Sequence, residues 1–315
     1  MKLRFWGVRG SINSPLSPDN YTSKIKSVLE HAVLDGISEK TDIDLFIRNL
    51  PDELKTTYGG NTSCVTISDD RTLLILDAGT GIRNLGSQLL SGKFFDPSIE
   101  EYNILFSHLH LDHINGLPFF APVHVPGKKV RFFSHHEEFE QMLKLQQNSN
   151  FFPVSLESRP SSKEFIILRE DEDIKIGDFV IMSKKLNHPN GSYAYSIEKK
   201  GKKIVYATDA EYTSNSILDS YSDFFRNADV LIFDSQYNFN ELAQRYSFGH
   251  STAEIGVDAA VSANVKKLLL FHHNHESSDR KIIDMKESSI NYLNEKYFGS
   301  DLDIIISNEG TEINF

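Results

Sequence analysis

The chain has 315 residues, of which 39% are hydrophobic and 24% charged, which is typical of a globular protein with a sizeable core. Its formal net charge of -11 disfavours a broad surface that tracks a phosphate backbone, because such surfaces need clustered lysine and arginine. A single cysteine, Cys64, excludes an intramolecular disulfide and a thiolate metal cluster, and we expect it in the core. Without a bilayer-length apolar run or a signal-peptide pattern, a cytoplasmic location and no membrane partner are expected.

Apolar β-rich runs alternate with helical patterns along most of the chain. Strands are predicted at residues 3–8, 64–67, 73–76, 103–106, 130–133, 165–168, 179–185, 194–197, 204–207, 230–233, 267–271 and 303–306. Helices are predicted at residues 82–90, 135–146, 214–226, 253–263 and 282–295. Twelve strands are too many for one ordinary sheet, so we expect two sheets covered by helices.

One segment interrupts this alternation. Residues 20–54 show two amphipathic helical patterns, with Ile25, Val28, Leu29, Ala32 and Val33 at helical spacing in the first. We interpret the segment as an insertion. It is either a packed surface elaboration, a lid, or a dimer contact that shapes the substrate pocket.

The segment SHLHLDH at 107–113 gives the strongest functional signal. It follows a predicted strand directly and carries four potential metal ligands: His108, His110, Asp112 and His113. Alternate side chains of an extended segment share a face, so the first two histidines can bind one ion. The aspartate and the last histidine lie past the turn and can reach a second ion.

Three further candidate ligands follow strands later in the chain. His188 comes after the strand at 179–185, and Asp209 comes after the strand at 204–207. A carboxylate has two oxygens and therefore suits a bridging position between two cations. His272 directly continues the strand at 267–271 and is favoured as the last ligand, although the adjacent His273 stays open as an alternative.

Imidazole and carboxylate ligands without a thiolate suit Zn²⁺, and also Mn²⁺ or Fe²⁺. We therefore expect two divalent metal ions, with zinc as the first choice. Asp77, in ILDAGTG, has two interpretations. It accepts a hydrogen bond from a ligand histidine, or it forms a turn ahead of Gly79.

Together with NHPN, ATDAEY and LFHHNH, the SHLHLDH motif resembles the metallo-β-lactamase fold superfamily of hydrolases. Four more segments resemble its phosphodiesterase branch: FWGVRGS at 5–11, YGGNTSC at 58–64, LDAGTGIR at 76–83 and GHSTA at 249–253. That branch holds tRNA 3′-end processing endonucleases, phosphoribosyl cyclic phosphodiesterases and phage enzymes that degrade cyclic nucleotide signals. The resemblance implies an α+β fold, a four-layer αββα sandwich that forms one domain over residues 1–315 with the helical insertion at 20–54.

The resemblance also implies roles for the candidate ligands. The first metal would be held by His108, His110 and His188. The second would be held by Asp112, His113 and His272. Asp209 would bridge the two.

GHSTA resembles a His-Ser-Thr segment of the tRNA-processing relatives, in which the histidine faces the scissile phosphate. The resemblance gives that role to His250 and gives Asp234, in IFDSQY, the task of orienting it. Phe233 stands where those relatives place a histidine, and the long arm with which they grip tRNA is not recognisable in the short region 135–160. With the acidic charge, these departures favour a small phosphodiester, such as a cyclic nucleotide, over long nucleic acid.

We therefore predict a metal-dependent phosphodiesterase in which the metal ions activate water, Asp112 accepts its proton and His250 serves the leaving oxygen. The alternatives are a tRNA 3′-processing endonuclease, a hydrolase of thioesters or lactones on the same fold, and a non-catalytic metal-bound sensor or scaffold. Relatives in this branch commonly pair, so the resemblance also suggests a homodimer.

Overall fold

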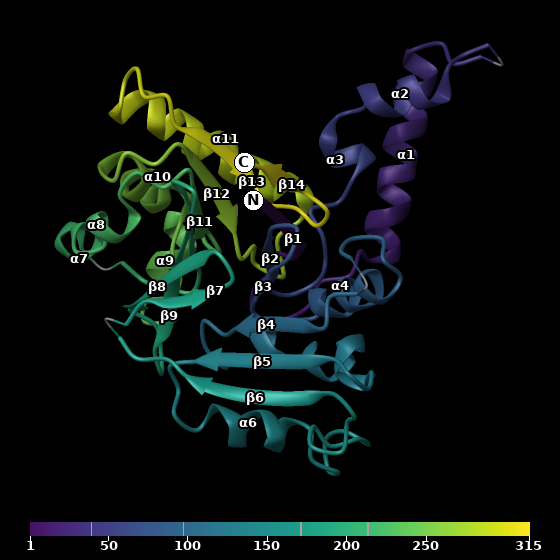
Figure 1. The fold of residues 1–315 in the computed structure, drawn as a ribbon. Helices are drawn as coiled ribbons and strands as arrows, with labels where there is room; N and C mark the ends of the chain where they lie inside the picture. The colour runs from purple at the N-terminus through teal and green to yellow at the C-terminus, as the bar shows by residue number, and fades with distance from the viewer. Residues whose placement is uncertain (39, 97, 171, 213) are drawn as a thin grey trace.

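The computed structural model describes residues 1–38, 40–96, 98–170, 172–212 and 214–315. Their strands form two sheets (Figure 1). In spatial order, the first sheet contains β14 (Glu312–Asn314), β1 (Lys2–Gly7), β2 (Cys64–Ser68), β3 (Leu73–Leu76), β4 (Glu101–Leu105), β5 (Lys129–Ser134) and β6 (Ser162–Ile167). The second contains β13 (Asp303–Ile306), β12 (Lys267–Phe271), β11 (Val230–Asp234), β10 (Lys202–Ala207), β9 (Ser192–Lys199), β8 (Phe179–Leu186) and β7 (Ile174–Ile176).

Helices cover the outer faces of both sheets. On the first sheet lie α4 (Gly81–Leu90), α5 (Leu111–Ile114), η1 (Leu117–Phe119), η2 (Ala121–His124) and α6 (Phe139–Gln146). On the second lie α7 (Asn215–Asp219), α8 (Ser222–Phe225), α10 (Ala253–Ser262) and α11 (Asp279–Lys296), and α9 (Phe239–Gln244) follows β11. A third core lies between the sheets, where Phe5 of β1 and Phe271 of β12 meet with ring centroids 5.9 Å apart. The predicted αββα sandwich is confirmed.

All twelve predicted strands are present, and the structure adds β7 and β14. Both additions are three-residue strands at sheet edges, too short to show an apolar alternation in the sequence. Two helix predictions were wrong in part. The helix predicted from residue 135 begins at Phe139, and the helix predicted at 214–226 is divided into α7 and α8.

The insertion is helical, as predicted, with residue 39 outside the described part. It contains α1 (Pro18–Leu34), α2 (Ile43–Asn49) and α3 (Asp52–Lys55), and Figure 1 shows α1 and α2 extending away from the two sheets. Every residue of α1 and α2 is described, and none is buried. Lys24 of α1 nevertheless donates to the Asp279 carboxylate at 2.6 Å, so this helix contacts the rest of the protein through its polar side.

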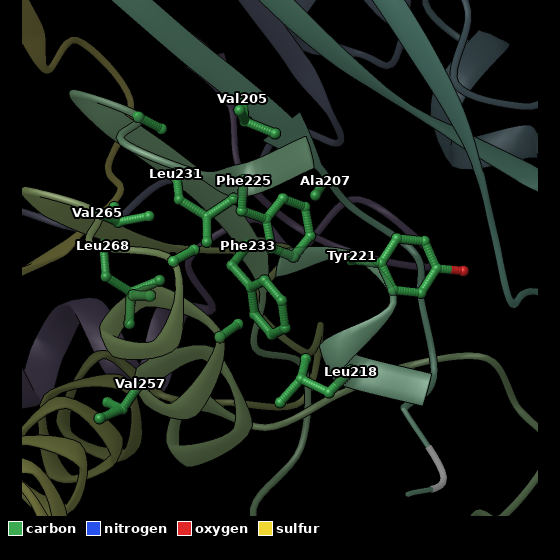
Figure 2. Packing of buried hydrophobic residues seen from close by; sticks show 14 of the residues in the cluster. Val205, Ala207, Leu218, Tyr221, Phe225, Leu231, Phe233, Val257, Val265 and Leu268 are labelled. Atoms are coloured by element: carbon green, nitrogen blue, oxygen red, sulfur yellow. The ribbon is translucent and has the colours of Figure 1, made fainter. Parts of the chain in front are cut away.

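Figure 2 shows the core on the outer side of the second sheet. Val205, Leu231 and Phe233 project from the sheet strands. They meet Phe225 of α8 and Val257 of α10, and all five side chains are fully buried. This packing fixes the second sheet against its helices.

Replacing Phe225 with alanine should destabilise the protein by about 3–5 kcal/mol, because a buried ring is removed and a cavity remains. The ring is fully buried and lies 6.0 Å from the ring of Tyr221. Chemical denaturation would measure the loss. Phe298→Ala is the matched control: this side chain is 97% exposed, so its change should stay within about 0.5 kcal/mol. Equal effects of the two substitutions would contradict the core assignment.

The topology gathers loops at one edge of each sheet. Strands β3 to β6 are parallel to one another, and so are β10 to β13. The carboxyl ends of parallel strands lie at the same edge, which is where side chains for a site commonly converge. Among the described residues, no helix is both long and apolar enough to cross a membrane.

Candidate metal centre

The ends of strands from both sheets deliver the predicted metal ligands to one place. His108 lies just past β4, and α5 begins right after His110 and carries Asp112 and His113. His188 follows β8, Asp209 follows β10 and His272 follows β12. All but His110 of these seven residues are buried. The structure brings all seven together, in overlapping groups whose candidate ligand atoms lie within 4.8 Å of one another.

The first group is a triad of imidazoles from His108, His110 and His188. The Nε2 atom of His188 lies 3.1 Å from Nδ1 of His110. On its other side, Nδ1 of His188 donates to the carbonyl oxygen of Gly249 at 2.8 Å, which fixes the ring. A side chain at Gly249 would collide with that ring, since an added Cβ would lie 2.2 Å from Nδ1 of His188.

The second group contains Asp112, His113 and His272. Nε2 of His272 lies 3.2 Å from Oδ2 of Asp112 and 3.3 Å from Nε2 of His113. The choice left open between His272 and His273 is answered by position. His273 points away and donates from Nε2 to the carbonyl oxygen of Ser307 at 2.9 Å.

Asp209 lies between the two groups. Its Oδ2 is 3.3 Å from Nε2 of His113, and its Oδ1 is 3.4 Å from Nε2 of His272. Its Oδ1 is also 3.9 Å from Nε2 of His108, a member of the first group. One carboxylate therefore faces both groups, which is the position that a bridging ligand needs.

The donor atoms suit divalent cations. Nε2 of His108 is buried and has no hydrogen-bond partner among the described residues, so this nitrogen is available to a metal ion. Nε2 of His113 and Nε2 of His272 face each other at 3.3 Å, an arrangement that a cation between them would stabilise. Imidazoles and carboxylates around such positions are typical of Zn²⁺, Mn²⁺ and Fe²⁺ sites. The fold and these clusters indicate divalent metal ions.

The pKa shifts of three candidate ligands also fit a cation site. Burial, reinforced by His113, holds the pKa of His108 well below its ordinary value, so its lone pair is available. Burial favours the neutral acid of Asp209, but the neighbouring His272 and His113 lower its pKa well below the ordinary range. Burial also disfavours the imidazolium of His113, yet Asp209 and Asp112 raise its pKa well above the usual value. The two carboxylates thus favour positive charge at His113, and a divalent cation bound there would displace its proton.

Asp77 contacts several of the groups that surround the candidate ligands. Its Oδ2 lies 2.8 Å from Nδ1 of His113 and accepts from the hydroxyls of Ser107 at 2.7 Å and Tyr206 at 2.8 Å. The first of its two interpretations is therefore the one that the structure supports. Its backbone is left-handed, with φ of 60°, as it is at Asp209 and His272. Such strained residues gather where a site fixes their geometry.

Replacing Asp77 with asparagine should weaken metal affinity by about 10- to 100-fold, because the histidine loses the carboxylate that orients its ring. Competition with a coloured chelator would measure the affinity. Asp229→Asn is the matched control. Asp229 is also buried, and it pairs with Lys266 at 2.8 Å. It lies just before β11, at the end of that strand opposite to Asp234. A wild-type metal affinity in Asp77→Asn would contradict this orienting role.

The predicted pair of His250 and Asp234 borders the cluster. Nδ1 of His250 lies 2.8 Å from Oδ2 of Asp234, which is fully buried at the end of β11. The same oxygen accepts the backbone N–H of Asp209 at 3.1 Å. The His250 ring stacks on His272 with centroids 5.2 Å apart. An oriented and partly exposed imidazole therefore lies directly beside the candidate ligands.

Sequence reasoning missed several polar contacts of the site. The backbone N–H of Ser11 donates to Oδ2 of Asp112 at 2.7 Å, and Gln236 donates to the Ser11 hydroxyl at 2.9 Å. Gly10 lets the chain approach closely, since an added Cβ would lie 2.5 Å from the His272 ring. Ser11 lies in the FWGVRGS segment, but no local pattern indicates that its amide reaches a carboxylate about 100 positions away.

The chain is similar to known proteins over most of its length. The family model of the Beta-lactamase superfamily domain matches residues 72–273. Ribonuclease Z of Picrophilus torridus is 25% identical over 290 residues, which cover 78% of this chain and 89% of that protein. Ribonuclease Z of Prochlorococcus marinus is 32% identical over 119 residues, which cover 38% of this chain and only 34%, about a third, of that protein.

The fold is also similar to solved structures. The metallo-beta-lactamase fold protein YhfI from Bacillus subtilis superposes with a TM-score of 0.66 at 18% sequence identity. The superposition covers 99% of this chain and 98% of YhfI. At this identity the likeness concerns the fold.

Proposed function

Since this chain belongs to the beta-lactamase superfamily, we propose that it is a metal-dependent hydrolase that cleaves phosphodiester bonds, with residues 1–315 as one domain. The observation that carries this proposal is the oriented His250–Asp234 pair next to seven candidate ligands. Cleavage of a phosphodiester leaves an alkoxide, which needs a proton or a stabilising charge. Relatives named Ribonuclease Z also support a phosphodiester substrate.

We propose two metal ions, with zinc first and Mn²⁺ or Fe²⁺ as alternatives. His108, His110 and His188 would hold one, Asp112, His113 and His272 the other, and Asp209 would bridge them. When bound, the ions would neutralise phosphate oxygens and lower the pKa of water towards about 7.

The chain's own residues would carry the protons. The Asp112 carboxylate, held by the Ser11 amide at 2.7 Å, would accept the proton of the attacking water. Asp234 holds Nδ1 of His250, so Nε2 is the atom that would deliver a proton to the leaving oxygen. Burial of the candidate ligands keeps the dielectric low, which strengthens these interactions.

A small substrate with an aromatic group, such as a cyclic nucleotide, is our proposal for the substrate class. Phe248 and Tyr246 are 58% and 67% exposed and lie one and three positions before Gly249, whose carbonyl oxygen contacts His188. Exposed aromatic rings beside a phosphate site can stack on a base. The net charge of -11 disfavours a long polyanion. A cytoplasmic location stays part of the same proposal.

RNA is the second candidate substrate, favoured by the Ribonuclease Z match that covers 89% of the Picrophilus torridus protein. The test is elemental analysis combined with a substrate panel: bis(p-nitrophenyl) phosphate, 2′,3′-cyclic and 3′,5′-cyclic nucleotides, precursor tRNA, a thioester and a lactone, each with Zn²⁺ or Mn²⁺. We expect two metal equivalents per chain and fastest turnover on a small phosphodiester. Cleavage of the tRNA alone would favour the endonuclease. Inactivity on every phosphodiester with metals bound would overturn the proposal and leave a thioesterase, a lactonase or a sensor.

A further inference from the structure

Arg9 is a buried cation near the candidate metal centre that the proposed reaction does not use. It lies just past β1 in the FWGVRGS segment, and its side chain is 4% exposed. A guanidinium offers no lone pair to a metal ion, so Arg9 is not a candidate ligand itself. A buried charge is costly unless its surroundings compensate it closely, so the partners of this guanidinium indicate what it does.

Two loops meet at this guanidinium. Its Nε donates to the carbonyl oxygen of Gly59 at 2.7 Å, and its Nη1 donates to those of Asn274 at 3.0 Å and Ser277 at 2.8 Å. Its Nη2 lies 3.8 Å from Oδ1 of Asp279, which supplies the opposite charge. Gly59 belongs to the loop before β2, whereas the other two carbonyls belong to the loop between β12 and α11. The planar fork of donors therefore joins both loops at three backbone positions.

The loop between β12 and α11 begins at His272. The backbone of His272 is left-handed, with φ of 61°, a conformation that persists only where the surroundings impose it. Asn274 and Ser277 lie two and five positions further along the chain. Arg9 therefore fixes the loop directly after the strained residue that enters the candidate metal centre.

The ring of His272 lacks the support that other candidate ligands have. Nδ1 of His113 is held by a carboxylate and Nδ1 of His188 by a backbone carbonyl, each at 2.8 Å. Nδ1 of His272 is buried and has no hydrogen-bond partner among the described residues, and it lies 3.9 Å from Oδ2 of Asp234. Ligand histidines are usually oriented through their second ring nitrogen. The orientation of this ring therefore depends on the backbone that carries it.

The segment that contains Arg9 packs directly against this ring and its neighbour. The backbone N–H of Gly10 donates to the carbonyl oxygen of His273 at 2.9 Å, and the N–H of His273 donates to the carbonyl oxygen of Val8 at 2.9 Å. A Cβ added to Gly10 would lie 2.5 Å from the His272 ring, so no side chain separates the segment from the ring. The position of the ring is thus set by residues 8–10 and by the loop that Arg9 holds.

We propose that Arg9 is the positioning residue of the second metal group, which contains Asp112, His113 and His272. Its guanidinium fixes the loop after β12 against the segment that carries it, so that the His272 ring stays 3.2 Å from Asp112. Two positions further, the Ser11 amide holds Asp112 itself at 2.7 Å. None of the three carbonyls lies in a loop that carries the first group, so that group should not depend on Arg9. This inference rests on the proposed function, because it concerns how tightly the second group binds a metal ion.

The experiment is a metal titration of the full chain against a coloured chelator, which measures the affinity of each metal equivalent. Arg9→Lys keeps the charge but cannot donate to three carbonyls from one planar fork. We expect one of the two equivalents to bind about 10- to 100-fold more weakly and the other to keep its wild-type affinity. Arg159→Lys is the matched control, since Arg159 is 3% exposed and donates to the carbonyl oxygen of Val154 at 3.2 Å in the loop between α6 and β6. It should leave both affinities unchanged.

Chemical rescue separates positioning from a general loss of stability. Arg9 lines a cavity of about 240 Å³ between α1, α3 and the start of α11, so Arg9→Ala leaves a space that a small cation can reach. Millimolar guanidinium should restore much of the weakened affinity in Arg9→Ala, because it replaces the lost donors. Methylammonium has the same charge without the planar fork and should not restore it.

The outcomes separate this inference from the proposed reaction. Wild-type affinities in Arg9→Lys, or equal weakening of both equivalents, would overturn the positioning role and leave the reaction intact. Failure of guanidinium to restore the affinity of Arg9→Ala would do the same. A wild type that binds fewer than two metal ions would overturn this inference together with the two-metal proposal. If Arg9→Ala does not fold, as judged by circular dichroism, the selective loss measured in Arg9→Lys decides.

Discussion

Replacing Asp209 with alanine is expected to abolish turnover and to reduce the bound metal below two equivalents per chain. The Asp209 carboxylate lies 3.3 Å from His113 and 3.4 Å from His272, and it also faces His108. Without it, two cations held close together would lose the shared anion between them. We expect the rate to fall by at least about 10³-fold, the range in which a principal charge stabiliser contributes. Metal content by elemental analysis and the rate on bis(p-nitrophenyl) phosphate would be measured on the same sample.

Asp209→Asn separates charge from backbone strain. Asp209 has a left-handed backbone with φ of 58°, which asparagine tolerates better than alanine. Asparagine keeps the size of the side chain but removes its negative charge, so the asparagine protein should fold normally and still lose the second metal and its activity. Full activity with two metals in either variant would contradict the bridging role. Asp229→Asn, at the far end of β11, controls for loss of a buried carboxylate elsewhere.

Replacing His250 with alanine is expected to leave both metals bound and to slow turnover by about 10²- to 10⁴-fold. The ring contacts the ligand cluster by stacking on His272, but its Nδ1 is committed to Asp234 at 2.8 Å. It would therefore act on the leaving oxygen and not on the metals. Metal content and steady-state kinetics would be compared with the wild type.

The leaving group makes this test specific. A p-nitrophenolate departs without protonation, so His250→Ala should lose much less rate on bis(p-nitrophenyl) phosphate than on a diester with a ribose hydroxyl as leaving group. Asp234→Asn should give a smaller loss in the same pattern, since the imidazole remains but its orientation weakens. Equal losses on both substrates would contradict proton donation and indicate a role in binding.

The sequence indicates the residues of the candidate site because they follow apolar strands. His188, Asp209 and His272 stand next to runs whose strand character is local, and parallel strands must bring their carboxyl ends to one edge. The family motifs then assigned His250 and Asp234. The choice between His272 and His273 needed coordinates, because adjacent residues past a strand point in different directions, and the structure places His272 beside Asp112 and His273 beside Ser307.

The hydrogen bonds that hold these residues could not be predicted in the same way. Asp77 was equally consistent with a turn and with a histidine partner, and the structure shows it bound to His113, Ser107 and Tyr206. Tyr206 is 129 positions away from Asp77 in the chain. Such contacts depend on how the two sheets face each other. No local pattern in the sequence indicates a contact between residues so far apart in the chain.

The amino-acid sequence by itself determined all strands but β7 and β14, the two-sheet architecture and the residues that could bind metal, because apolar periodicity and side-chain chemistry are local properties. It also determined that the insertion contains amphipathic helices. Only the tertiary structure decided which face of α1 meets the rest of the protein, and there Lys24 and its partners hold the polar face while Leu29 faces solvent. Periodicity shows that a helix has an apolar face, but the partner of that face is set by contacts between distant parts of the chain, or between chains.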